Sequence, residues 1–320
     1  MTELECNIAN EIRNGGSIPF ARFMELALYE PKLGYYRNGR DPFGVPGDFY
    51  TAEQLQPVFG EMVAAYTARC AEDAGGASDF SVLEIGAGRA ELEPFLRRWR
   101  YVPFDFGRGA LPKSVTGLVI ANEFFDALPV HLLRKERNDW LELCVGLKGN
   151  EFVFVQSGEI PAELIEYARR YARDVEEGSI VEASLAALEW IACISRILDR
   201  GRLLVIDYGY EAKELRRFGQ GSLIGYRRHQ AKDDVLAAPG TKDITAHVNF
   251  TALRDAARRS GFLERKTCAF AEWARSLWDE EEFRLRWETA NRRWRLQWKQ
   301  LVFGLGETFR VMELKKQAGK

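Results

Sequence analysis

The stretch VLEIGAGRAEL, residues 82–92, decides the fold of this 320-residue chain. An apolar run enters a turn with two glycines, Gly86 and Gly88, and helical spacing of apolar residues follows at Leu92, Phe95 and Leu96. Strand, glycine-rich turn and helix in this order are typical of doubly wound α/β sheets, whose first turn approaches a nucleotide-like ligand. We therefore predict that residues 80–85 form the first strand of such a sheet.

The rest of the chain supplies further elements of this kind. Apolar runs at 101–105, 117–122 and 203–207 predict buried strands, and residues 140–155 alternate as a hairpin broken at Gly149-Asn150. Helical spacing recurs at 19–29, 57–71, 162–173, 183–198, 251–259 and 271–300. Continuous apolar strands separated by helices indicate a mostly parallel sheet covered on both faces.

Composition limits the class of protein. Hydrophobic residues make up 46% of the chain, which excludes disorder as the main state. Lys plus Arg number 45 and Asp plus Glu 47, and this balance argues against a dedicated nucleic-acid or membrane-surface protein. No apolar run reaches the roughly 18 residues of a membrane span, and the N-terminus carries neither a signal nor a transit peptide.

Cysteine and histidine usage points in the same direction. Five scattered cysteines favour reduced thiols, and three histidines without a C-x-x-C pair give no metal site. We expect a soluble intracellular protein without a metal, cytoplasmic if its source is bacterial. Whether the chain forms a homodimer is left open.

Two ligands compete for the glycine-rich turn. A dinucleotide site uses G-x-G-x-x-G/A, but here the third position is Glu91, whose charge would face a pyrophosphate. S-adenosylmethionine is cationic at sulfur and carries no phosphate, so an acid at the strand end, Glu84, suits it better. Asp105 lies 19 residues after Gly86 and is the candidate for ribose hydroxyls, unless it is a solvated strand-end acid.

A second polar segment follows the 117–122 strand, namely NEFFDALP at residues 122–129. Ligands collect at the carboxyl ends of strands in doubly wound sheets. Glu123 and Asp126 are three residues apart, so one helical turn would place both on one face, where two carboxylates suit a guanidinium group. The alternative is a helix N-terminus at which acids are favoured by the dipole.

Several longer segments resemble the MidA-like family of class I S-adenosylmethionine-dependent methyltransferases, which includes the mitochondrial complex I assembly methyltransferase. The resemblance covers nearly the whole chain, and GDFYTAEQLQPVFGEM (47–62) and ANEFFDALPVH (121–131) are its most specific blocks. Further matches are PFARFMELALYEPKLGYY (19–36), LEIGAGRAEL (83–92), LLVIDYG (203–209), YRRH (226–229), DITAHVNF (243–250) and GETFRV (306–311).

The resemblance implies a Rossmann-like fold, the cofactor S-adenosylmethionine and methyl transfer to arginine on a protein, a subunit of respiratory complex I type. Cofactor-binding residues would be Glu84, Gly86, Ala87, Gly88, Asp105 and Asn122, and catalytic residues Asn122, Glu123 and Asp126. Gly47, Asp48 and Thr51 would form a loop over the substrate site, joined by Tyr208, His229 and His247. Tyr208 is alternatively a turn aromatic, and the two histidines are alternatively neutral and hydrogen-bonded.

The sequence also predicts a domain division. An N-terminal helical and loop region at 1–76 would cover the substrate site, and residues 77–320 would form the methyltransferase domain with an inserted segment at 210–250 and a helical region at 271–303. Trp287, Trp294 and Trp298 share one helical stripe near several arginines, which favours packing against the body over stacking on RNA.

Two departures from the family pattern bear on the site. Ala90 stands where the family usually has glycine; because alanine is a good helix former, we expect the turn to survive. Only 37 residues separate Glu84 from Asn122, so Asp105 could follow the second strand (ribose) or the third (adenine). The short segment at 93–118 motivates an alternative, a non-catalytic assembly or binding protein that retains the fold. A third alternative, an NAD-dependent oxidoreductase, is disfavoured by Glu91.

Overall fold

The computed structural model describes residues 1–39, 57–227, 230–232, 234–306 and 308–317. The chain forms two compact units. Unit 1 comprises Met1–Phe49, Asp126–Glu189 and Tyr210–Ala252, and unit 2 comprises Tyr50–Phe125, Trp190–Gly209 and Leu253–Lys320. This division differs from the sequence-based ranges 1–76 and 77–320, because α1 (Glu3–Gly15) and α2 (Phe20–Tyr29) belong to unit 1 whereas α3 (Val58–Asp73) belongs to unit 2.

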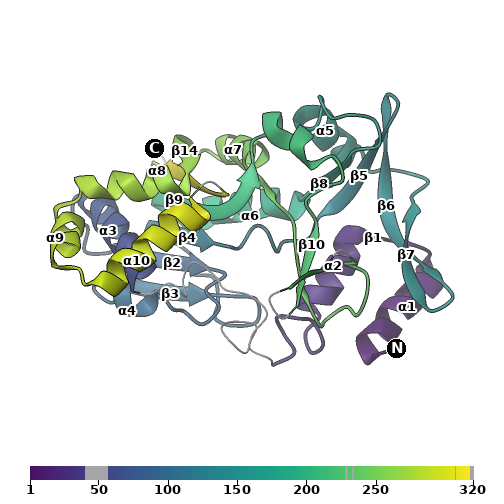
Figure 1. Cartoon of the computed structure of the whole chain (residues 1–320), viewed down its shortest axis with the longest axis horizontal. Coiled ribbons are helices and arrows are strands. Elements are labelled where there is room, and N and C mark those ends of the chain that lie inside the picture. The colour runs from purple at the N-terminus through teal and green to yellow at the C-terminus, as the bar shows by residue number, and fades with distance from the viewer. Residues whose placement is uncertain (40–56, 228–229, 233, 307, 318–320) are drawn as a thin grey trace. The chain divides into compact units, whose positions relative to one another are not determined.

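The sheet of unit 2 has the strand order β14-β15-β9-β4-β2-β3 along its main path (Figure 1). The strands β3, β2, β4 and β9 run parallel, as the apolar runs predict, whereas β15 and β14 add an antiparallel edge that the sequence patterns did not indicate. The bounds are β2 (Ser81–Ile85), β3 (Arg100–Phe104), β4 (Val115–Asn122), β9 (Leu198–Tyr210), β14 (Leu263–Ala269) and β15 (Phe309–Lys316).

Two glycines allow the central strands of this sheet to lie close at their start. Gly117 of β4 is in register with Ser81 of β2 and with Gly201 of β9. A Cβ atom on Gly117 would lie 2.2 Å from the carbonyl oxygen of Ser81, and one on Gly201 would lie 1.9 Å from that of Gly117. Both residues also have φ near +140°, so only glycine fits at either position.

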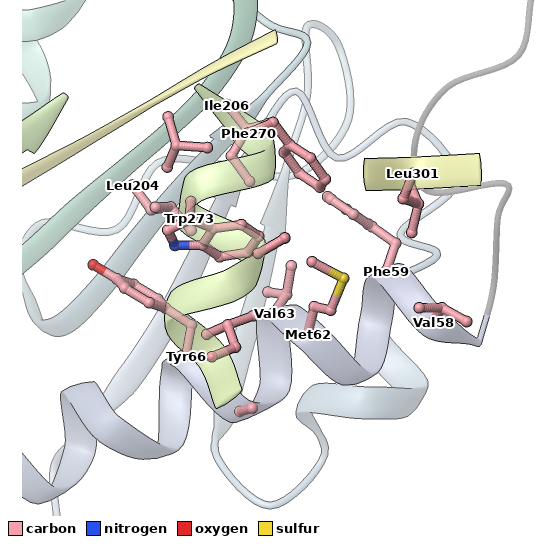
Figure 2. Close-up of a cluster of buried hydrophobic side chains, with 14 of the residues drawn as sticks. Val58, Phe59, Met62, Val63, Tyr66, Leu204, Ile206, Phe270, Trp273 and Leu301 are labelled. Carbon is pink, nitrogen blue, oxygen red and sulfur yellow. The ribbon is translucent and has the colours of Figure 1, made fainter. Parts of the chain in front are cut away.

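The core of unit 2 lies between the sheet and helix α3 (Figure 2). Phe59, Met62, Val63 and Tyr66 of α3 point toward Leu204 and Ile206 of β9, with Phe270 and Trp273 of α8 (Phe270–Ser276) between them. All eight side chains are fully buried. The hydroxyl of Tyr66 donates a hydrogen bond to Glu313 of β15 at 3.0 Å, which satisfies the polar end of this buried ring.

The C-terminal helices pack on the same core, as the tryptophan stripe predicts (Figure 1). Glu61 of α3 accepts hydrogen bonds from Arg286 Nε and Trp294 Nε1, each at 2.7 Å. Trp278, Trp287 and Trp298 lie partly buried around them. The predicted helical tail is divided into α8, α9 (Glu281–Thr289) and α10 (Arg292–Gln300), with a 3₁₀ turn at Leu277–Asp279 and a π-helical turn at Leu301–Leu305.

Unit 1 contains a separate antiparallel sheet in the order β1-β6-β5-β8, with β7 paired to β6. The predicted hairpin at 140–155 is confirmed as β6 and β7. A smaller sheet joins β11, β10 and β12 within the segment predicted as an insertion. The bounds are β1 (Ile18–Pro19), β5 (His131–Glu136), β6 (Asp139–Lys148), β7 (Glu151–Gln156), β8 (Ile180–Ala183), β10 (Ile224–Arg227), β11 (Gln230–Lys232), β12 (Asp243–Thr245) and β13 (Val248–Asn249).

The helices of unit 1 are α1, α2 and α5 (Ala162–Tyr171), together with the 3₁₀ helix η2 (Ala212–Phe218). Thr2 caps α1 in a reciprocal capping box with Glu5. Two helices pass from one unit to the other along the chain, α6 (Leu185–Ile197) and α7 (Phe250–Arg259). All five cysteines are free thiols, as their spacing predicts. Among the described residues, no helix combines the length and the apolar character needed to cross a membrane.

Truncation of Phe59 to alanine tests the core of unit 2. Phe59 is fully buried and stacks on Phe270 with ring centroids 6.4 Å apart. We expect Phe59→Ala to lower the free energy of unfolding by about 3–5 kcal/mol, because it leaves a cavity. Phe303→Ala serves as the control, since that ring is 78% exposed. Urea unfolding followed by circular dichroism measures both; equal losses would contradict this account of the core.

Candidate functional site

The glycine-rich turn follows β2 and is closed by the chain's own hydrogen bonds. The N–H groups of Gly86 and Ala87 donate to the carbonyl oxygen of Phe104 at 2.9 and 3.0 Å. Gly88 N–H donates to Asp105 Oδ2 at 2.9 Å. These three turn N–H groups are therefore already bonded to acceptors at the end of β3 and on Asp105, the residue that follows it. A carboxylate and a guanidinium group both bond the turn: Asp105 accepts from Gly88 N–H, and Arg108 Nη1 donates to Gly88 O at 2.8 Å.

Glu84 is the buried acid of this turn. It is the last residue but one of β2, directly before Ile85, and its side chain is buried, at 1% exposed. The hydroxyl of Tyr101 on β3 donates a hydrogen bond to Glu84 Oε2. A carboxylate held in this position favours a neighbouring positive charge.

The position of Asp105 in the sheet is settled by the strand order. β3 pairs in parallel with β2 on the side away from β4, so Asp105 follows the second strand, which is the ribose side. The chain then turns back at once, with Asp105 and Arg108 exchanging backbone hydrogen bonds of 2.9 and 3.0 Å. No third strand lies beyond β3 in the described part of this sheet.

Three aromatic rings pack on one another beside the turn. Phe106 stacks on Phe124 with centroids 6.1 Å apart and planes at 14°. Trp190 of α6 contacts both rings edge-on, at 5.7 and 5.1 Å. Phe124 also limits the turn, because a Cβ atom on Gly86 would lie 2.8 Å from its ring. The apolar side of the turn is thus built from side chains instead of a strand.

The helix expected after the turn is shorter than the sequence indicates. Between Gly88 and the start of β3, the only helical residues are those of α4 (Glu93–Leu96). The turn survives at Ala90 but not for the expected reason, because this residue has φ +58° and lies in a left-handed turn, where alanine's helix propensity does not help. The turn nevertheless keeps its backbone bonds, with Ala90 N–H donating to Ala87 O at 2.6 Å.

Glu123 and Asp126 do not share a helical turn, so that prediction is wrong. Glu123 has φ +47°, and residues 123–128 form bends and turns. The backbone is held instead by β9: Glu123 N–H donates to Ile206 O at 2.9 Å, and Phe125 N–H donates to the buried carboxylate of Asp207 at 3.0 Å. Asn122, which is 4% exposed, ends β4 directly before this reversal.

Asp126 begins the middle segment of unit 1 and lies among residues that the sequence did not single out. It is 5% exposed, and its carbonyl oxygen accepts from Ala246 N–H at 3.0 Å. Tyr29 donates to the neighbouring carbonyl of Ala127 at 2.9 Å, and Tyr36 donates to Asp243 Oδ1 at 2.8 Å. Burial, and then the carboxylates of Asp243 and Asp126, raise the pKa of Tyr36 well above its usual range.

Three of the family-like segments, 19–36, 121–131 and 243–250, supply these residues. Tyrosines within those segments were the available signal, but a tyrosine in an amphipathic helix is ordinarily a core residue. Only the assembled unit shows that Tyr36 bonds a buried carboxylate 207 residues further along the chain.

The remaining described candidates, Tyr208 and His247, belong to different units. Tyr208 packs edge-on against Phe309 of β15, with centroids 5.5 Å apart, in unit 2. His247 belongs to unit 1, where its ring lies 4.9 Å from that of Phe218 and burial lowers its pKa. Gly47, Asp48, Thr51 and His229 lie outside the described residues.

The acids beside the turn fit S-adenosylmethionine better than a dinucleotide. Glu84 would face a cationic sulfonium or ammonium group, and Asp105 would accept from ribose hydroxyls. A pyrophosphate would meet both carboxylates and would find the turn N–H groups already bonded. Fold and site together define a class I methyltransferase.

Comparison with known proteins places the chain within that class. A family model of S-adenosyl-L-methionine-dependent methyltransferases matches residues 95–266. The chain belongs to this family, whose cofactor is S-adenosylmethionine. It is similar to the protein arginine methyltransferase NDUFAF7 homolog of Drosophila melanogaster, with 26% identity over 312 residues, 78% of this chain and 69% of the relative. The human protein arginine methyltransferase NDUFAF7 is 25% identical over 79% of this chain and 68% of its own.

Solved structures support the same assignment. A COG1565 superfamily member from Burkholderia thailandensis, bound to S-adenosyl-homocysteine, superposes with a TM-score of 0.88 at 28% identity. The match covers 99% of this chain and 92% of that one. A native structure of a COG1565 superfamily protein from the same organism has a TM-score of 0.82 at 27% identity, with the same coverage. The class I fold is therefore shown over nearly the whole chain.

Substitution of Asp105 by asparagine tests the ribose side of the site. We expect Asp105→Asn to weaken S-adenosylhomocysteine binding roughly 10- to 100-fold, because a hydrogen bond to a charged group contributes about 1.5–3 kcal/mol. Isothermal titration calorimetry measures the affinity. Glu93→Gln is the matched control, because Glu93 is an exposed acid in the first turn of α4. An affinity equal to that of the unsubstituted protein would remove Asp105 from the cofactor site.

Proposed function

We propose that this protein transfers a methyl group from S-adenosylmethionine to an arginine side chain of a protein. The observation that carries the proposal is the pair of acids, Glu84 and Asp105, at the ends of adjacent parallel strands beside the glycine-rich turn. Family membership and the S-adenosyl-homocysteine-bound relative support the cofactor. The names of the relatives in fly and human support arginine as the acceptor.

The cofactor side of the proposal assigns a role to each acid. When bound, S-adenosylmethionine supplies an electrophilic methyl group on a sulfonium. Glu84 stabilises the positive charge, and Asp105 orients the ribose while keeping its bond to Gly88 N–H. Gly86 and Gly88, at φ +75° and +47°, let the backbone turn where a side chain would be strained. Ala87 closes the turn through its bond to Phe104 O.

The acceptor side of the proposal rests on Asn122, Glu123 and Asp126. These residues follow β4, and carboxylates there orient a guanidinium group and take up the proton that the alkylated nitrogen releases. Glu123 lies in a left-handed bend and Asp126 lies in a turn. The two carboxylates therefore do not share a helical face, and each is positioned by its own stretch of backbone.

The partner in this proposal is a protein, and by family resemblance a subunit of respiratory complex I type. The fly and human relatives are named as mitochondrial. For a bacterial source we propose the cytoplasm. Nucleic acid is disfavoured as a partner because the C-terminal tryptophans are engaged with one another and with the core of unit 2.

A second candidate function is that of a non-catalytic binding or assembly protein. It is favoured by one observation: the sheet ends at β3, and Phe106, Phe124 and Trp190 pack on one another beside the turn. A protein that retained the fold without turnover would need neither the ribose acid nor Glu123. Cellular complementation by Glu123→Gln and Gly88→Trp variants separates the two functions, because only a non-catalytic role survives both.

Substitution of the acceptor-side acids tests methyl transfer directly. We expect purified protein with radiolabelled S-adenosylmethionine and cell extract to label a protein band, and Asp126→Asn to reduce the initial rate roughly 100-fold or more, as for loss of a group in general acid–base catalysis. Glu142→Gln is the control, because Glu142 is a buried acid of unit 1 that instead contacts His131 at 2.6 Å. Absence of cofactor binding at millimolar concentration would end the proposal.

A further inference from the structure

A buried polar cluster in unit 1 lies outside every role assigned above. We name it the Glu182 cluster, after the carboxylate of β8 at its centre, and its other members are Tyr167, Tyr171 and Tyr210. These four side chains are between 1% and 5% exposed. They come from α5, from β8 and from the last residue of β9, so three separate elements bring them together.

Glu182 has one oxygen that is bonded and one that is not. Oε1 accepts from the backbone N–H groups of Ser222 and Leu223, at 2.5 and 3.1 Å. Oε2 is buried and has no hydrogen-bond partner in the structure. A Cβ atom on Gly221 would lie 2.5 Å from Oε1, so glycine is required for this segment to approach the carboxylate. Burial raises the pKa of Glu182, against the opposing effect of the Ser222 and Leu223 bonds.

Aromatic rings enclose the same place. The backbone N–H of His247 donates to Ser222 Oγ at 2.9 Å. The centroid of the His247 ring lies 4.9 Å from that of Phe218. Phe218 in turn lies 5.4 Å from Tyr210. Ser222, His247, Phe218 and Tyr210 therefore form a continuous series of contacts that begins at the segment bonded to Glu182. Burial, and then the charges of Tyr167 and Glu182, raise the pKa of Tyr210. The cluster is therefore an acid surrounded by aromatic rings.

Further polar atoms of the cluster also lack partners. The hydroxyl groups of Tyr171 and Tyr210 are buried and make no hydrogen bond within the described chain. Tyr171 is joined to the others through Tyr167, at 4.9 Å between ring centroids. Nearly all buried polar groups in proteins have a hydrogen-bond partner. Three buried oxygens without one in a single cluster, Glu182 Oε2 and the hydroxyls of Tyr171 and Tyr210, therefore indicate a missing ligand. Each of the three can accept a hydrogen bond.

We propose that Glu182 and Tyr210 form a binding site for a guanidinium group, with Tyr171 as a further hydrogen-bond acceptor. A guanidinium carries five N–H donors in one plane, stacks on aromatic faces and neutralises a buried carboxylate. Water alone would bond an oxygen of Glu182 but would supply no positive charge to favour the ionised carboxylate. A transition metal is not favoured, because the described residues hold no group of three or more metal-ligating acids, histidines or cysteines.

The guanidinium could come from two sources, the arginine of a protein acceptor or a small free molecule such as arginine. Binding itself does not depend on the proposed methyl transfer; only its identification with the acceptor rests on the proposed function. Residues 219–222 lie over Glu182 and are half-buried or, at Gln220, exposed. Displacement of this one segment would give a ligand access to the carboxylate.

Binding of methylguanidinium to the full chain tests the proposal. We expect calorimetry or ligand-observed NMR to detect methylguanidinium binding, with urea, its neutral analogue, binding at least about 10-fold more weakly because it lacks the charge. Glu182→Gln should weaken methylguanidinium binding roughly 10- to 100-fold, and Tyr210→Phe roughly 3- to 10-fold. Glu142→Gln, the buried acid beside His131, should leave binding unchanged.

The outcomes separate this site from the proposed function. Failure of methylguanidinium to bind, equal binding of urea, or full binding by both variants would overturn the guanidinium site, whatever the methyltransferase assay shows. If Glu182→Gln does not fold, as judged by circular dichroism and S-adenosylhomocysteine binding, Tyr210→Phe decides alone, since it removes a single oxygen. A peptide with arginine, compared with its citrulline form and with free arginine, identifies the source: the acceptor is supported where only the arginine peptide gains affinity from Glu182.

Discussion

The carboxylate of Asp207 is fully buried and accepts hydrogen bonds from the backbone N–H groups of Phe125 and Tyr208. A carboxyl group at this depth needs hydrogen-bond donors for its oxygens, and loss of either bond would weaken that compensation. The bond to Phe125 ties the end of β4 to the end of β9. It holds the chain in the sharp reversal at Glu123, so the position of Asn122, and the point at which Asp126 enters unit 1, both depend on it.

Backbone N–H groups that are bonded within the chain also shape the glycine-rich turn. In a phosphate-binding turn the backbone N–H groups point at the ligand. Here Phe104 O and Asp105 accept them, while the Arg108 guanidinium donates to Gly88 O at 2.8 Å. The bonded N–H groups and the buried acid Glu84 favour a cationic ligand over a phosphate, in agreement with the family to which the chain belongs. The aromatic group of Phe106, Phe124 and Trp190 supplies the apolar side that a third strand would have formed.

Most elements of the parallel sheet could be predicted because their signals are local. Apolar runs of strand length identify β2, β3, β4 and β9, and apolar spacing identifies α2, α3 and α5. The antiparallel edge strand β14, LERKTCA, was missed because its polar composition is that of a half-exposed strand and resembles a loop. The helix expected after Gly88 and the helical turn expected at Glu123 and Asp126 failed for a different reason: Ala90 and Glu123 adopt left-handed conformations that no apolar spacing indicates.

The candidate site, like the fold, has some features that follow from the sequence and others that follow only from the tertiary structure. By itself the sequence determined the glycine-rich turn, the acids Glu84 and Asp105 and the family, because these depend on short spacings along one strand and its turn. Only the tertiary structure decided that Asp105 follows the second strand, since strand order is a property of long-range pairing. It alone brought Tyr36 to Asp243 and Glu182 to Tyr210. Burial turns an ordinary tyrosine or glutamate into part of a site, and no local pattern records which side chains the fold will bury together.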